Sequence, residues 1–127
     1  MHYDRDESLE AVVRDIVAKL GMDYIDLSRL FCMRSRGTST RRTLARIHTI
    51  PRIMQKAVGV KPHYVIEVLS ENFDRLSPED KTRTLIHELM HIPSAFSGGF
   101  RQHNIHVTRS GVERLYRDYV RACCRGF

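Results

Sequence analysis

The residues with the clearest chemical potential are two histidines and a glutamate in the run His87-Glu88-Leu89-Met90-His91. On a helix, side chains four residues apart share a face, with Cβ atoms about 5–6 Å apart, so both imidazoles can bind one metal ion. Glu88 can then reach a water on that ion without binding the ion itself. The spacing predicts hydrolysis by a water that one Zn²⁺ activates, with His87 and His91 as ligands and Glu88 as general base.

The expected helix supports this interpretation over a purely structural one. Leu85, Leu89 and Ile92 form an apolar stripe, which predicts burial on most sides. In the structural alternative, the two histidines are satisfied core residues and Glu88 pairs with an arginine. Two imidazoles and a carboxylate on a buried helix are costly unless they are used, so the pattern favours a functional site.

A catalytic zinc needs a third protein ligand and keeps one position open for water. We expect His103 to be this ligand, because Pro93 and two glycines between His91 and His103 can turn the chain back toward the helix. His106 and Glu113 remain alternatives. With four protein ligands the site would instead be structural, and the protein a binding module.

Peptide hydrolysis also needs a donor to the oxyanion and a surface for the substrate. Arg101, His106 and Tyr116 are the candidate donors. Alternatively Arg101 is a surface charge, and the place of Tyr116 in the apolar stripe of the last helix favours a core role. The segment 63–69 is the clearest strand, since β-branched and aromatic residues dominate it. At a sheet edge it could bind an extended peptide by strand addition; in the sheet interior it would be structural.

The remaining elements follow from apolar spacing and from start and stop signals. We expect a helix over 9–20 with Gly21 after it, strands over 29–36 and 43–49 paired as a hairpin, and a helical turn over 53–58. A helix should run from Pro78, capped by Ser77, to about His91, and a last helix should open at Ser110 with a capping box. This order predicts a single α+β domain over 1–127 with about three strands in a mostly antiparallel sheet and helices on one face.

Composition limits the class of protein. The chain has 127 residues, a formal net charge of +6 and three cysteines, with no apolar run that could cross a bilayer. Neither a secretory signal nor a disulfide framework is apparent, which favours the cytoplasm and no membrane partner. The basic balance makes nucleic acid a possible partner beside a protein or peptide substrate. A hairpin of arginines around 34–46 could bind phosphate or could simply be a solvated loop.

The residues also carry a family resemblance. The stretches 84–93 and 97–103, with 45–48 and 62–68 upstream, resemble small metallopeptidases of archaea and phages. That resemblance implies a small zincin-like domain with His87, His91 and His103 as ligands and Glu88 as the catalytic residue. More distantly, the layout is similar to SprT-like (Spartan-type) proteases, which implies action on DNA-associated proteins. Three hypotheses follow: a zinc peptidase, a non-catalytic metal-binding module that contacts nucleic acid, and an enzyme that is latent outside a larger assembly.

Overall fold

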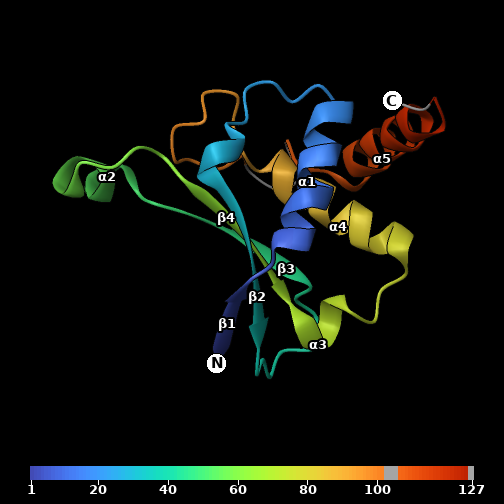
Figure 1. The fold of residues 1–127 in the computed structure, drawn as a ribbon, viewed down its shortest axis with the longest axis horizontal. Helices are drawn as coiled ribbons and strands as arrows, with labels where there is room; N and C mark the ends of the chain where they lie inside the picture. The colour runs from blue at the N-terminus through green and yellow to red at the C-terminus, as the bar shows by residue number, and fades with distance from the viewer. Residues whose placement is uncertain (102–105, 126–127) are drawn as a thin grey trace.

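The chain folds around one sheet and the helices that pack on it (Figure 1). The computed structural model describes residues 1–101 and 106–125. Within them the strands are β1 (His2–Arg5), β2 (Leu30–Arg36), β3 (Ala45–Thr49) and β4 (Tyr64–Leu69). The helices are α1 (Glu7–Lys19), α2 (Arg52–Val58), α3 (Ser70–Phe73), α4 (Pro78–Met90) and α5 (Arg109–Cys124), with a 3₁₀ turn at Leu27–Arg29. None of these helices is long and apolar enough to span a membrane.

The sheet is mixed, with strand order β1-β2-β4-β3. Strands β1 and β2 are antiparallel, β2 and β4 are parallel, and β4 and β3 are antiparallel. The α+β class is confirmed, but the sheet has four strands in the described part of the chain rather than about three. The strand that the sequence did not reveal is β1, whose four exposed, mostly polar residues carry no alternating apolar pattern.

The expected hairpin between the second and third strands is wrong. Both strands form, yet each pairs with β4 instead of with its neighbour in sequence. Residues 37–44 allow this because the segment is long enough to run from the end of β2 past β4, so that β3 pairs on the far side of β4. The side-chain amide of Asn72 holds this connection by donating to the carbonyls of Thr40 (3.0 Å) and Thr43 (2.8 Å). Strand β4 therefore lies inside the sheet, where its apolar side chains are most fully buried.

One face of the sheet carries the hydrophobic core. Ile66 and Val68 of β4 contribute to it from the sheet, Ile16 from α1, and Leu85 and Leu89 from α4, all at 0–1% exposure. Burying one such side chain contributes about 1.5–3 kcal/mol before chain entropy is counted, so this cluster fixes both helices on the sheet. Helix α5 packs against α1 and α4, on the side of the molecule opposite α2 (Figure 1).

The two long C-terminal helices begin at side-chain caps. Ser77 Oγ accepts from the backbone N–H of Asp80 (3.1 Å), as the sequence predicts for the start of α4. The predicted start of α5 at Ser110 is wrong, because Thr108 provides the cap instead. Its hydroxyl oxygen accepts from the backbone N–H of Gly111 (3.0 Å), so the helix begins at Arg109.

Candidate active site

Helix α4 places the two motif histidines on one face. The rings of His87 and His91 lie 5.2 Å apart between centroids, with 29° between their planes. The opposite face of the helix is held in the core by Leu85, Ile86 and Leu89, each at 0–1% exposure. Because those three side chains fix the rotation of the helix, the histidines and Glu88 are directed to the cleft beside it.

The orientation of His91 is set by a backbone carbonyl. Its Nδ1 lies 2.8 Å from the carbonyl oxygen of Arg101, and the N–H of Arg101 in turn donates to the carbonyl of His91 (2.7 Å). A carbonyl can only accept, so the proton of the neutral ring must be on Nδ1 and the lone pair on Nε2. Metal-binding histidines are typically held in this way by a second hydrogen bond. The arrangement therefore fits a metal ligand.

Glu88 is a buried carboxyl between the two histidines. It is 7% exposed, and no described residue donates a hydrogen bond to it. Burial raises its pKa to about 7, because the charged form loses its hydration. A buried carboxylate without protein donors is costly for folding, which favours a functional role for Glu88 over an ion pair with an arginine.

A cleft of about 590 Å³ runs between the motif and the edge of the sheet. Its walls are Ala45, Arg46 and Ile47 of β3 on one side, and Phe100 and Arg101 on the other, with His87, Glu88 and His91 between them. A second hollow of about 800 Å³ continues beyond His87 between α4 and α5. The three motif residues thus line one cleft, and His87 also lines the second hollow.

The edge strand beside the cleft is β3, and β1 forms the other edge of the sheet. The hypothesis that residues 63–69 form an edge is wrong, since β4 lies between β2 and β3. The carbonyl of Leu44 accepts from the N–H of Leu69 (3.0 Å), which directs position 44 toward β4. Backbone groups alternate along a strand, so those of Ala45 and Ile47 point away from β4. The free edge therefore presents N–H and C=O groups beside the cleft.

A tight loop after the motif is held by Tyr64 of β4 and leads the chain back to His91. The hydroxyl of Tyr64 accepts from the N–H of Gly98 (2.9 Å) and donates to the carbonyl of Gly99 (2.8 Å). Gly98 has φ of +97°, and a Cβ there would lie 2.2 Å from Nε2 of Gln55 and 3.0 Å from the carbonyl oxygen of Ile50. Only glycine fits this position, and the loop that it allows delivers Arg101 to His91.

The third ligand stays a prediction, because His103 lies outside the described residues. His106 is exposed in a turn. Glu113 borders the second hollow but forms a bidentate pair with Arg83, at 3.0 and 3.2 Å. In residues 1–101 and 106–125 no three His, Cys, Asp or Glu side chains are grouped to hold a metal ion.

The candidate oxyanion donors are separated by the fold. Arg101 lines the cleft beside the motif histidines. Tyr116 lies on α5, where its ring packs against the core and under the guanidinium of Arg83, 4.1 Å from Cζ to the ring centroid. Arg101 is therefore the one of the two that the fold brings to the cleft.

A comparison with protein families matches a family described as "Putative phage metallopeptidase" over residues 1–126. The chain belongs to this family. Metallopeptidases cleave peptide bonds with a bound metal, so membership agrees with the chemistry of the motif and confirms the phage part of the resemblance. Neither a curated protein nor a solved structure matches the chain.

Sequence reasoning missed two parts of this family member's cleft. The first is the carbonyl of Arg101, which acts through the backbone and leaves no trace in the side-chain pattern. The second is the wall formed by Ala45 and Ile47, whose place depends on strand order. The glycines at 98 and 99 could have indicated the contact between the Arg101 carbonyl and His91, since they predict a tight turn after the motif helix.

Proposed function

We propose that this phage metallopeptidase family member is a zinc-dependent peptidase that uses His87, His91 and His103 as ligands and Glu88 as general base. The observation that carries the proposal is the pairing of two stacked imidazoles with a hydrogen bond that leaves the lone pair of His91 on Nε2. Neutral imidazole nitrogen is a preferred donor for zinc, so the residues present fit that metal.

Zinc bound by these histidines would lower the pKa of a bound water and polarise the scissile carbonyl. The protein supplies the proton transfers. An oxygen of the Glu88 carboxylate takes a proton from the attacking water and later passes it to the leaving amine. Arg101, at the wall of the same cleft, is the donor that we propose for the developing oxyanion. His106 is the alternative donor.

The substrate is proposed to bind as an extra strand on β3. The outward backbone groups of Ala45 and Ile47 can pair with an extended peptide, which then passes over Glu88. Backbone pairing holds any sequence in register, so side-chain preference must come from the walls of the cleft and from its two ends. A protein or peptide is accordingly the proposed substrate.

Two further features belong to the proposal, namely the class of substrate and the cellular compartment. The net charge of +6 supports action on DNA-associated proteins, as the SprT-like resemblance implies. Free thiols at Cys32, Cys123 and Cys124 suit a reducing cytoplasm. A non-catalytic metal-binding module that contacts nucleic acid is the alternative, and it predicts metal binding and DNA binding without hydrolysis.

The experiment that tests the proposal is elemental analysis of purified wild type beside His87→Ala, His103→Ala and His106→Ala. We expect about one zinc per chain in wild type and in His106→Ala, and a loss of most zinc in the other two variants. Zinc that stays in His103→Ala but leaves His106→Ala would reassign the third ligand.

Glu88→Gln separates metal binding from chemistry. The amide cannot accept the proton, so this variant should keep its zinc and lose peptide hydrolysis. Hydrolysis should be measured on a denatured protein substrate with and without added DNA. Cleavage by Glu88→Gln at the wild-type rate would exclude the mechanism, and a zinc-free protein that rejects added zinc would exclude the function.

A further inference from the structure

The segment between β3 and β4, residues 50–63, projects from the body of the protein and carries α2 at its tip (Figure 1). We refer to it as the α2 arm. Ile53, Met54 and Val58 of α2 are 77%, 49% and 61% exposed, and Val60 is 39% exposed. Around the helix axis Ala57 lies between Ile53 and Met54, and Val58 follows Met54 by one turn, so these residues form one apolar face. Solvent, rather than the core, covers that face.

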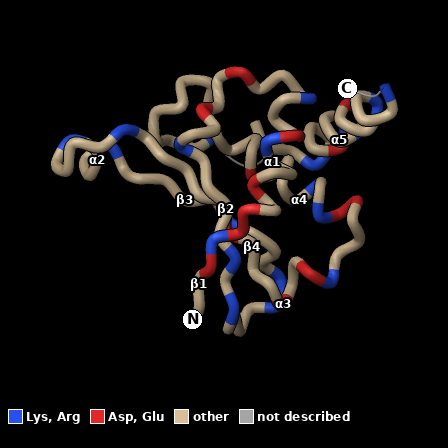
Figure 2. Tube along the Cα trace, viewed as in Figure 1, with Lys and Arg blue, Asp and Glu red and all other residues tan. Residues whose placement is uncertain are grey.

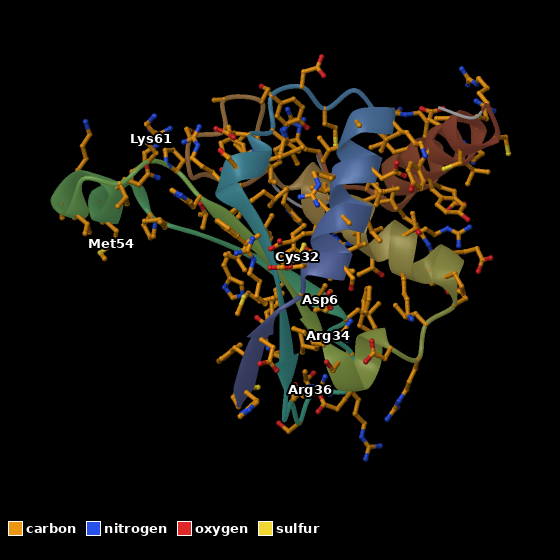
Figure 3. All side chains as sticks on the ribbon, viewed as in Figure 1. Asp6, Cys32, Arg34, Arg36, Met54 and Lys61 are labelled. Carbon is orange, nitrogen blue, oxygen red and sulfur yellow. The ribbon has the colours of Figure 1, made fainter. Side chains whose placement is uncertain are left out.

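The arm is also purely cationic. It contains Arg52, Lys56 and Lys61 and no acidic residue, as Figure 2 shows along the projecting segment. Met54 and Lys61 extend from opposite sides of the arm (Figure 3). The acid-free region is wider than the arm: residues 27–66 hold nine Lys or Arg and none of the chain's Asp or Glu.

Most of these cations form no ion pair with a carboxylate of the described residues. Of the nine, Arg29, Arg34 and Arg46 form ion pairs with carboxylates. The other six form none with the residues that the structure describes: Arg36, Arg41, Arg42, Arg52, Lys56 and Lys61. Four of those six flank β3, with Arg41 and Arg42 before the strand and Arg52 and Lys56 after it. A chain lying along β3 would therefore meet positive charge at both ends.

The arm is tied to the candidate active site. Nε2 of Gln55 donates to the carbonyls of Ile50 (2.8 Å) and Ser97 (3.2 Å), and Arg52 donates to Oγ of Ser97 (3.3 Å). The loop that begins at Ser97 leads within four residues to Arg101 and the cleft. These polar contacts hold α2 against the loop that leads to the cleft and leave the apolar face of the arm exposed.

We propose that the α2 arm is a docking site for the substrate, and that it binds a polypeptide segment rich in acidic and apolar side chains beyond the scissile bond. The proposal rests on the proposed peptidase function. Acidic side chains would pair with Lys56 and Lys61, and apolar ones would cover Ile53 and Val58. A second copy of this chain is disfavoured, because its arm carries the same positive charge. Nucleic acid would pair with the cations but leave the apolar face exposed.

Binding to the Glu88→Gln protein tests the proposal without depending on hydrolysis. The probes are a labelled disordered peptide rich in Glu and Leu, its counterpart with Lys in place of Glu, and a labelled DNA duplex, each followed by fluorescence anisotropy. Lys56→Glu with Lys61→Glu removes the charge of the arm. The matched control is Arg114→Glu with Arg117→Glu on the exposed face of α5, which makes the same change in net charge.

We expect the Glu peptide to bind more tightly than the Lys peptide, and the arm charge variant to bind it about tenfold more weakly, with the control within about twofold. Ile53→Ser with Val58→Ser should also weaken it, with less salt dependence. Equal loss in arm and control variants, equal binding of both peptides, or no peptide binding would overturn the proposal. Arm-dependent binding of DNA alone would overturn it in favour of nucleic acid.

Cleavage assays separate this proposal from the peptidase function. Arm-dependent peptide binding with no cleavage by wild type would contradict the peptidase function and support the docking site. Cleavage of both peptides at equal kcat/KM, unchanged in the arm variants, would leave the peptidase function and overturn the docking site.

Discussion

Helix α4 turns Leu85, Ile86 and Leu89 into the core, whereas helix α2 leaves Ile53 and Val58 in solvent. Core packing fixes α4 so firmly that it can hold Glu88 and two histidines at the cleft. Helix α2 has no buried residue and is attached through polar contacts to the loop at Ser97. The apolar side chains of α4 serve folding, and those of α2 are left for recognition.

The largest effect should come from breaking the α4 side of this comparison. Leu89→Ala leaves a cavity under the metal motif, because Leu89 is 0% exposed. We expect a loss of about 2–5 kcal/mol in the free energy of unfolding, measured by urea denaturation followed by circular dichroism. Leu89→Met, which conserves volume, should cost less than about 1.5 kcal/mol. Similar small losses in both variants would mean that α4 is not fixed by the core.

A smaller effect should follow from disturbing the loop at Gly98, which follows α4 and contacts Gln55 of α2. Gly98→Ala forces a Cβ at φ +97° against Gln55 and Ile50, and should cost about 1–3 kcal/mol. It should also weaken zinc binding, since the same loop carries Arg101 to His91. Gly99→Ala is the matched control, because nothing lies within 4 Å of its added Cβ. Equal unfolding midpoints for the two variants would contradict the close approach of Gln55 and Ile50 in the arm to Gly98.

Glu10 of α1 is a buried carboxylate that the protein stabilises with hydrogen-bond donors, in contrast to Glu88 of α4. Burial alone would raise its pKa, but hydrogen bonds from Arg5 (3.0 Å) and from the N–H of Cys32 (2.9 Å) outweigh it and lower the pKa. A lowered folded pKa means that the stability from Glu10 is complete above its unfolded pKa, about 4.3, and is lost as pH falls through the folded value.

Glu10→Gln should therefore cost about 1.5 kcal/mol near neutral pH and progressively less in acid. Urea unfolding at a series of pH values measures this difference. A gap between wild type and variant that stays constant into strong acid would show that the carboxylate charge is not what stabilises the pair.

The smallest effect is expected on the α2 side. Ile53→Ser with Val58→Ser should change the free energy of unfolding by no more than about 0.5 kcal/mol, because both side chains are more than half exposed already. Thermal unfolding of the double variant checks this. A clear loss of stability would mean that the arm folds against the body and is not an exposed surface.

The sequence predicted the elements better than their partners. The helix that carries the motif, its cap at Ser77 and the strand before Leu69 are local features, set by side-chain spacing and caps within a few residues. The neighbours of β4 depend on contacts far apart in the chain, and nothing in residues 29–49 distinguishes a hairpin from two strands that flank a third. The edge position of β3 could therefore not be predicted from the sequence.

The site divides in the same way. Residue type and spacing pointed to His87, Glu88 and His91, and the structure places them together at one cleft. The apolar stripe of the last helix favoured a core role for Tyr116 over a role as donor, and its ring does pack against the core. The choice of His103 remains a prediction.

The hydrogen bond that orients His91 comes from the main chain of Arg101, and this has a consequence for engineering. A substitution at position 101 changes the side chain in the cleft wall but cannot delete the carbonyl. The orientation of His91 is thus independent of the side chain at position 101. A substitution at position 101 should therefore remove the side chain that we propose as oxyanion donor without removing the hydrogen bond that orients His91. Substitutions of Gly98, or loss of the Tyr64 hydroxyl, should instead disturb the turn that delivers this carbonyl.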